Sequence, residues 1–237
     1  MSDERLSGLP DQWRRLDGGG AVPAAVAAAA VRLLPVDGAA VLLMRDRTRW
    51  NTTAATDSTI TAIADLQQTV GEGPSVEAYV SGGPVLVPEL AAARRWPALL
   101  PAFADVRAFF SFPLQLGAVR IGVLDLYRWT PGRLDRPALA DALRLADLAA
   151  VALVHDPATA AIDDVGGWAF DADFRPEIDQ ASGMLSVQLG VDIAAAYARL
   201  RGHAFAAGLP LVEAAAAVVA GTLRLDGDVN RPPDPDS

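Results

Sequence analysis

The segment 176–226, near the C-terminus, constrains the fold most, because its pattern divides it into three short amphipathic helices. Gly190 and Gly208 separate them, since glycine commonly ends a helix. Asp192 is placed to cap the second helix, and Pro210 to open the third, which is expected to run to the end of the segment. Helices this short need mutual packing, so an all-α unit is predicted. Its apolar stripes run through Ile178, Ala181, Leu185 and Leu189, then Ile193, Ala196, Tyr197, Leu200 and Ala204, then Leu211, Ala214, Ala215, Val218 and Val219.

Many of these residues also form a pattern with fixed offsets across the three helices. It consists of Gln180, Ala181, Gly183 and Leu185, then Ala196, Tyr197, Leu200, Arg201 and Ala204, then Leu211, Ala214 and Ala215. This pattern resembles that of the ANTAR domain family. The resemblance implies an RNA-binding module that recognises a pair of small stem-loops in a nascent transcript. Family members typically prevent terminator formation, and some instead affect translation.

The resemblance supplies candidate RNA-contacting residues in the first two helices. They are Arg201, Arg199, His203, Gln180 and Ser182. RNA loops are read by charged and polar side chains and by stacking on unpaired bases. Arg201 matches the family pattern, whereas Ser182 stands where many relatives carry a lysine. Gly183 is expected to permit close approach of the helices.

Structural roles compete with RNA contact at several of these positions. Arg201 would equally well form an ion pair with Asp179 or Glu213 across the bundle. Gln180 would as readily brace a helix junction. Tyr197 falls on the apolar stripe and is expected in the core.

The charge balance limits which nucleic acids this chain would bind. The net charge is −9, which argues against a DNA-coating protein and against attachment to anionic lipid. The C-terminal part also holds more acids than arginines, so non-specific binding to duplexes should be weak. Any RNA binding must depend on shape and on a small basic face. A DNA-binding helix-turn-helix is a poor alternative for the same reason.

Missing residue types exclude most catalytic chemistry. The chain has no cysteine and no lysine, and its two histidines, His155 and His203, lie in different segments. Thiol catalysis, a Walker phosphate loop and a Schiff base are therefore excluded, and neither a metal site nor a cofactor is expected. We predict that the protein is not an enzyme. The sequence shows neither a signal peptide nor a membrane span, so a cytoplasmic location is expected.

The N-terminal part alternates short helices with strands and is predicted to be α+β with an antiparallel sheet. The expected helices are 23–34, 60–68, 76–80, a helical piece within 95–103, and 136–154, whose stripe runs through Leu139, Leu143, Ala146 and Ala150; the expected strands are 39–44, 49–56, 84–87, 108–116 and 119–129. This order, the segment LQQTVGEGPSVEAYVSGGPVLVPEL and the hairpin SFPLQLGAVRIGVLDLYRW resemble a GAF domain over residues 22–154. The resemblance implies a sensory cup for a small molecule and dimerisation through the terminal helices.

Candidate ligand-binding residues of this cup follow from position in the sequence. They are Trp50, Ser75, Arg94, Arg95 and Trp96, with Gly71 and Gly73 beside them. Structural roles compete here too: Gly71 to Pro74 is a tight turn, Ser75 its helix N-cap, and Trp96 a lid over the core. Arg94 and Arg95 would be a solvated pair or would hold an anionic ligand. Because cysteine is missing, bilin attachment and a GAF-fold methionine sulfoxide reductase are both excluded.

The sequence thus predicts five regions: a flexible N-terminus (1–20), a GAF-like sensor (21–154), a linker (155–175), an ANTAR domain (176–227) and a disordered tail (228–237). Residues 158–165 of the linker could form a helical turn, and Trp168 and Phe170 are expected to anchor it. The leading hypothesis is a signal-responsive antiterminator whose homodimer binds tandem stem-loops. The alternative is a small-molecule-binding regulator whose ANTAR segment serves dimerisation or protein contacts without RNA. The sequence leaves the signal, the RNA target and the sign of regulation open.

Overall fold

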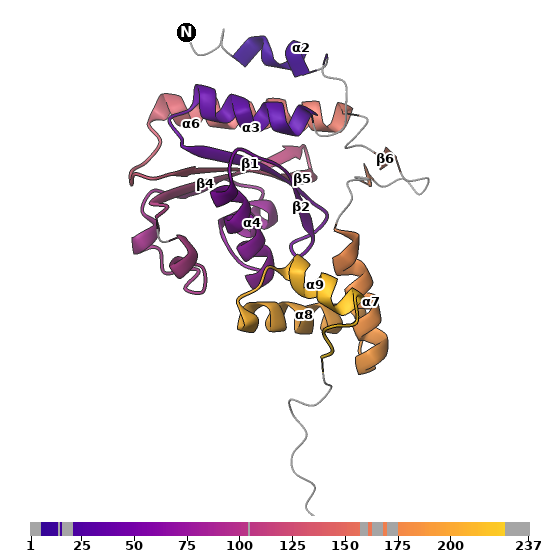
Figure 1. Cartoon of the computed structure of the whole chain (residues 1–237). Helices are drawn as coiled ribbons and strands as arrows, with labels where there is room; N and C mark the ends of the chain where they lie inside the picture. Colours follow the sequence, from indigo (N-terminus) through magenta and orange to yellow (C-terminus); the bar gives the residue numbers. More distant parts are fainter. Residues whose placement is uncertain are drawn as a thin grey trace, which may run out of the picture. The chain divides into compact units, whose positions relative to one another are not determined.

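A five-stranded antiparallel sheet organises the N-terminal part of the chain (Figure 1), as predicted for the α+β class. Its strand order is β2-β1-β5-β4-β3. The strands are β1 (Gly38–Met44), β2 (Trp50–Ala55), β3 (Val85–Val87), β4 (Ala108–Leu116) and β5 (Val119–Arg128). The computed structural model describes residues 6–13, 15, 21–103, 105–156, 161–162, 168–169 and 175–225. The chain divides into two units, Met1–Phe174 and Arg175–Ser237.

The centre of the sheet is buried on both sides. Every residue of β1 is buried, which explains why this strand is apolar throughout. β4 and β5 form the predicted hairpin, with Phe110 opposite Leu126. Gly122 of β5 lies so close to β1 that a Cβ atom there would sit 1.9 Å from the Leu42 carbonyl oxygen. Glycine is therefore required where these two strands meet.

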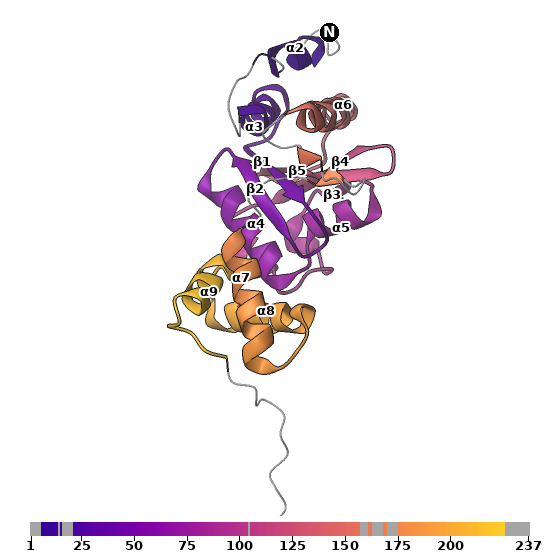
Figure 2. The ribbon, with the colours of Figure 1, turned by 90° about the vertical axis from the view of Figure 1, so that its right-hand side faces the viewer.

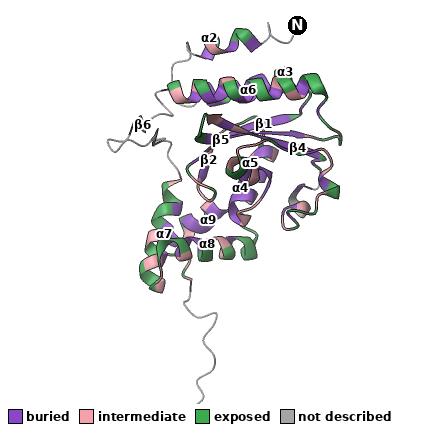
Figure 3. Cartoon of the chain, turned by 180° about the vertical axis from the view of Figure 1, so that it is seen from behind, coloured by how far each residue is buried: buried purple, intermediate pink, exposed green. Residues whose placement is uncertain are grey.

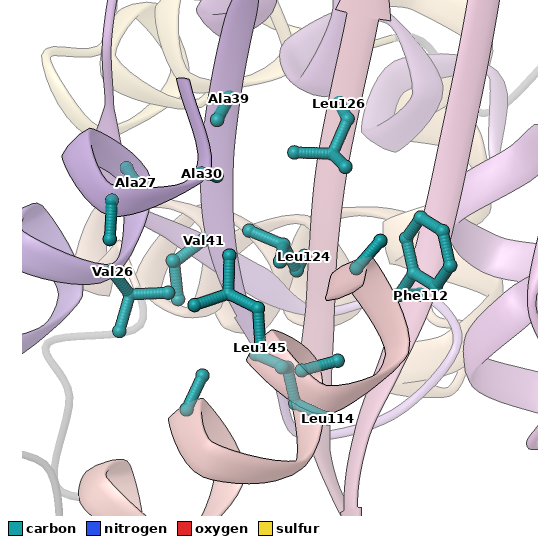
Figure 4. Close-up of a cluster of buried hydrophobic side chains, with 14 of the residues drawn as sticks. Val26, Ala27, Ala30, Ala39, Val41, Phe112, Leu114, Leu124, Leu126 and Leu145 are labelled. Atoms are coloured by element: carbon teal, nitrogen blue, oxygen red, sulfur yellow. The ribbon is translucent and has the colours of Figure 1, made fainter. Parts of the chain in front are cut away.

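Two helices, α3 (Ala21–Leu33) and α6 (Arg136–His155), cover one face of the sheet (Figures 1 and 2). Small and branched apolar side chains fill the layer between them and the strands (Figure 4). The predicted stripe of α6 was wrong at Leu143, which is 40% exposed. Ala142, Leu145 and Ala149 are buried instead, since small side chains let the helix lie close on the strands. The outward side of α6 is exposed (Figure 3).

The segment 1–20, for which the sequence predicted a flexible N-terminus, contains a helix with buried residues. Helix α2 (Leu9–Trp13) packs against α3 and α6. Leu6, Leu9 and Trp13 are buried in the same apolar cluster. The sequence prediction gave weight to the polar residues between them, although three large apolar side chains are enough to hold a short helix on a core. Residues 1–5, 14 and 16–20, which include the glycine run at 18–20, lie outside the described residues.

The other face of the sheet carries α4 (Ser58–Val70), α5 (Pro74–Ser81) and two 3-10 helices, η1 (Leu90–Ala92) and η2 (Leu100–Phe103). We call this side the cup face. Its core includes Trp50, Trp96, Phe103, Phe109 and Tyr127.

Three helices form the C-terminal unit: α7 (Pro176–Leu189), α8 (Ile193–Ala207) and α9 (Leu211–Val219). Asp192 caps α8 as predicted, accepting a hydrogen bond from the Ala195 N–H at 2.7 Å. Gly190 and Gly208 end α7 and α8 in the left-handed conformation. The core of the unit contains most of the predicted stripes.

Two predictions for the helical unit were wrong. α9 ends at Val219, not near residue 226, because the chain turns back there: the Thr222 and Leu223 N–H groups both donate to the Ala217 carbonyl oxygen. Ile193 is 62% exposed, since it occupies the first turn of α8 beyond the reach of the core.

The linker contains a short β-ribbon instead of the helical turn predicted at 158–165. β6 (Ala161–Ile162) pairs antiparallel with β7 (Trp168–Ala169). The anchoring role predicted for Trp168 and Phe170, and the disordered tail predicted at 228–237, fall on side chains and residues outside the described part.

Candidate functional site

A buried carboxylate lies at the centre of the cup face. Asp125 of β5 is 1% exposed, and each of its oxygens accepts one hydrogen bond. The Ser75 hydroxyl of α5 donates to Oδ2 and the Ser111 hydroxyl of β4 donates to Oδ1, both at 2.6 Å. Burial raises the pKa of Asp125 to about 7, while the two serine hydrogen bonds lower it. This residue therefore changes its charge state near neutral pH.

Gln67 of α4 extends the cluster. Its Oε1 accepts a hydrogen bond from the Ser75 N–H at 3.0 Å. Its Nε2 is fully buried and has no hydrogen-bond partner among the described residues. Gly73 lets the turn pack on this side chain, because a Cβ there would sit 2.2 Å from Gln67 Oε1. The cluster thus keeps one donor available inside an apolar layer.

The predicted role of Ser75 as a helix N-cap was wrong. Gly73 holds the N-cap position of α5, and Ser75 lies inside the first turn with its side chain buried. Its hydroxyl bonds to Asp125 instead, because a hydrogen bond to a buried carboxylate is stronger than one to a neutral backbone group. The turn predicted at Gly71 is present: Gly71 ends α4 at a φ of 77°.

The other predicted ligand residues separate into buried and exposed pairs. Trp50 and Trp96 are 2% and 5% exposed and belong to the cup-face core, and the Trp50 carbonyl oxygen accepts a hydrogen bond from Gln68 Nε2 at 2.9 Å. Arg94 and Arg95 are exposed. The Arg95 guanidinium lies 4.4 Å from the Trp96 ring centroid and 2.5 Å from Glu77. Arg95 therefore braces the outer side of Trp96.

Sequence reasoning missed Asp125, Ser111 and Gln67. One signal was available for Asp125, an acid in the middle of the apolar strand GVLDLY. A buried acid in a central strand needs hydrogen-bond donors, which points to partners on neighbouring elements. Ser111 and Gln67 carried no comparable signal.

The RNA-binding candidates on α8 lie on two different sides of the helix. Arg199 and His203 are four residues apart and share one side. Arg201 lies two residues from each, and therefore on the opposite side. Its guanidinium is 5.8 Å from the Tyr197 ring centroid. Tyr197 itself is buried as expected.

The candidates on α7 behave differently from one another. Gln180 is exposed. Ser182 is 2% exposed, and its hydroxyl donates to the Ile178 carbonyl oxygen at 2.7 Å. The prediction that Ser182 contacts RNA is therefore not supported, because its position faces the core of the bundle. Gly183 was predicted to permit close approach of the helices, and this prediction is wrong, because a Cβ there would meet nothing within 4 Å.

Phe205 is a candidate that sequence reasoning missed. It is 50% exposed and follows Arg201 by one helical turn, so Tyr197, Arg201 and Phe205 form a row along α8. We call these three residues the aromatic row. Unpaired bases stack on exposed aromatic side chains, and a neighbouring arginine adds a cation–π contribution. Phe205 beside Arg201 is therefore suited to contact a loop base.

The helical unit is close to neutral over residues 175–225. Four arginines, Arg175, Arg199, Arg201 and Arg224, stand against four acids, Glu177, Asp179, Asp192 and Glu213. Within the described part of the chain, no three His, Asp or Glu side chains gather as a metal site. No single described helix is long and apolar enough to cross a membrane, and α8 with α9 would qualify, by length and composition alone, only as a pair bent by 114°.

Comparison with solved structures shows the fold of the N-terminal unit. The chain is similar to the GAF domain of a phosphoenolpyruvate-protein phosphotransferase from Coxiella burnetii, with a TM-score of 0.52, 15% identity, and coverage of 65% of this chain and 93% of that one. The corresponding Acinetobacter GAF domain gives a TM-score of 0.51 at 14% identity, covering 68% and 96%. The reduced form of fRMsr from Staphylococcus aureus gives 0.50 at 12%, covering 64% and 94%.

Family models match both parts of the sequence. The GAF domain model matches residues 22–154, which is more than half of the chain, and the ANTAR domain model matches residues 172–219. Among curated proteins, no relative matches the chain. GAF and ANTAR are sensory and regulatory domains. The chain therefore belongs to the GAF domain family and, with its C-terminal ANTAR domain, is a GAF–ANTAR regulatory protein.

Proposed function

We propose that this protein is a cytoplasmic, signal-responsive RNA-binding regulator that acts on nascent transcripts by antitermination. A homodimer would present two ANTAR domains to two tandem stem-loops. The observation that carries this proposal is the ANTAR match at 172–219 directly after a GAF sensor domain. Regulation rather than catalysis fits a sequence that has neither cysteine nor lysine.

The aromatic row is the proposed RNA-contacting surface. Phe205 offers a flat apolar face to an unpaired loop base, and Arg201 offers a charged donor one turn away. Stacking of one base on an aromatic side chain contributes about 1–3 kcal/mol. Arg199 and His203, on the opposite side of α8, would contact the backbone of a different part of the RNA.

The near-neutral charge of the helical unit predicts selective binding with modest salt dependence. If Arg199 and Arg201 contact about two phosphates per domain, log K should fall with log salt with a slope of roughly −1.5 to −2 per stem-loop. A highly basic protein would show a much steeper slope. The recognition of loop shape must therefore supply most of the discrimination.

The Asp125 cluster is the proposed sensing element of the GAF domain. Gln67 Nε2 would donate to an acceptor on a small ligand. The protonation state of Asp125, and with it the hydrogen bonds from Ser75 and Ser111, would change with the charge of that ligand. Such a ligand would displace side chains of the cup-face core, since that layer is filled by buried residues. Trp50 and Trp96 would line the opened site, and the exposed Arg94 and Arg95 would meet only an anionic group at its rim.

The test is binding of the full-length protein to a tandem stem-loop RNA from its own genomic neighbourhood, measured by fluorescence anisotropy at two salt concentrations. Arg201→Ala and Phe205→Ala should each weaken binding about tenfold or more. Arg224→Ala is the matched control, because Arg224 is exposed in the same unit but lies beyond α9. RNA with a single loop should bind more weakly than the tandem RNA. Equal loss in all three variants would contradict the assigned surface.

The alternative function is a ligand-binding regulator whose ANTAR domain serves dimerisation or protein contacts only. The observation in its favour is exposed apolar surface on the helical unit, where Val187 is 86% and Met184 42% exposed. Sedimentation of the wild type and of Val187→Ser, run beside the RNA titration, separates the two functions. A dimer that Val187→Ser dissociates, together with no RNA binding under any salt condition, would establish the alternative.

A further inference from the structure

A cavity lies on the N-terminal unit, on the face of the sheet opposite the cup face. It has a volume of about 360 Å³, within the range of small-molecule sites. Its lining consists of Leu86, Pro88, Phe110, Arg133, Leu134 and Leu139. We call it the edge pocket, because its floor includes edge strand β3.

The pocket exists because the covering helices stop short of the sheet edge. Val85 and Val87 of β3 are buried toward the cup face, so Leu86 between them faces the other way. Leu86 pairs with Phe110 of β4, and the two form the floor. α6 packs on β4 and β5, yet Leu86 remains 39% exposed.

The wall of the pocket is held in place by the loop between β5 and α6. The Gly132 N–H donates to the Pro88 carbonyl oxygen at 2.8 Å, which ties this loop to the end of β3. Gly132 has a φ of 129°, a conformation that side-chain-bearing residues rarely adopt. Leu134 is buried after it, and Asp135 caps α6 by accepting from the Ala138 N–H at 2.8 Å. The wall is therefore built by specific local interactions.

The chemistry of the lining is apolar with one positive charge. Among the described residues that line the pocket, Arg133 is the one that carries a charge, and its side chain is exposed. Asp135, two residues after Arg133, is engaged as the α6 cap, and Glu89, next to the lining residue Pro88, lies 3.3 Å from Arg107. An apolar chamber with a guanidinium at its mouth complements an elongated apolar molecule with one anionic end.

We propose that the edge pocket binds a single-chain amphipathic anion of the medium-chain carboxylate class. The alkyl chain lies on Leu86, Phe110 and Leu139, and the carboxylate pairs with Arg133. This site is distinct from the Asp125 cluster, and its occupation does not depend on RNA binding. Leu139 belongs to α6, which ends at His155, just before the linker in the sequence. A bound ligand would therefore contact the helix that precedes the linker to the ANTAR domain.

The experiment is titration of the full-length protein with decanoate below its micelle concentration, followed by methyl NMR of the leucines and by calorimetry. Decanol and decylamine are the matched ligands without the negative charge. We expect saturable shifts at Leu86, Leu134 and Leu139 with decanoate, weaker ones with decanol, and the weakest binding for decylamine. Arg133→Gln should reduce decanoate affinity about fivefold and bring it to that of decanol.

Two further variants make the result decisive. Leu139→Trp fills the pocket and should abolish binding. If this variant fails to fold, Leu86→Gln places a polar group on the floor at an exposed position and should also abolish binding. Arg136→Gln, an exposed arginine outside the lining, should bind as the wild type does. Linear non-saturating shifts, equal affinity for decanoate and decylamine, or unchanged binding in Arg133→Gln would each overturn the proposal.

Discussion

The two units of this protein place their polar groups in opposite environments. In the GAF domain, Asp125, Ser75 and Gln67 are buried among apolar side chains and bonded to one another. In the ANTAR domain, Arg199 and Phe205 are exposed on α8, whose buried residues belong to the apolar core of the unit. Buried polar groups contribute to folding stability and respond to pH, whereas exposed ones can be replaced at little cost to the fold. The difference teaches that one unit is suited to sense a change and the other to present contacts.

The largest expected effect concerns the pH dependence of the GAF domain. Asp125 has an ordinary pKa near 3.8 when unfolded and about 7 when folded, so the folded state binds the extra proton between these values. Its contribution to stability is present in full below about pH 4 and is lost as pH rises toward 7, at up to about 1.4 kcal/mol per pH unit.

Asp125→Asn mimics the neutral carboxyl group and should flatten this slope, with a total difference on the order of 4 kcal/mol. Urea unfolding of both proteins between pH 4.5 and 8 measures it. Asp65→Asn, at a half-exposed position on α4, is the control and should keep the wild-type slope. Parallel curves for wild type and Asp125→Asn would remove Asp125 from the sensing role.

A smaller effect is expected from Ser75. Ser75→Ala removes one of the two donors to a buried carboxylate and should cost about 1–3 kcal/mol at pH 8, where Asp125 is ionised. At pH 5, where Asp125 is protonated, the cost should be smaller. Thermal unfolding at the two pH values checks this dependence. Ser81→Ala, on the exposed end of the same helix, should show no pH-dependent difference.

The smallest effect tests the ANTAR side of the comparison. Gly183→Ala should stabilise the protein by about 0.5–1 kcal/mol, because alanine favours the helix and its Cβ meets no atom within 4 Å. Gly73→Ala in the GAF domain should instead destabilise it, since its Cβ would overlap Gln67. Denaturant midpoints of the two variants give opposite signs if the comparison holds. A stable Gly183→Ala variant that no longer binds RNA would place this glycine at the RNA.

Local patterns predicted much of the fold. The β4–β5 hairpin followed from two alternating apolar runs around a glycine, and the boundaries of α7 and α8 followed from Gly190, Asp192 and Gly208. These signals act between residues close in sequence, so they can be recognised without tertiary contacts.

The missed features depend on contacts between distant residues. The bond from Ser75 to Asp125 joins residues 50 positions apart, and the buried side of α6 is chosen by the strands beneath it. The surroundings of Ser182 and Gly183 also depend on tertiary packing: the folded bundle buries the Ser182 hydroxyl, which donates to the Ile178 carbonyl oxygen, and leaves open space around Gly183.

The edges of the five-stranded sheet bear on how copies of this protein meet. β3 is only three residues long, and β2, at the other edge, pairs with β1 through an irregular register at Val41 and Leu42. A short strand and a bulged pairing are poor templates for a further strand. Growth of the sheet from one molecule into the next is therefore disfavoured, which protects the apolar strands of this sheet against fibrillar aggregation at high concentration.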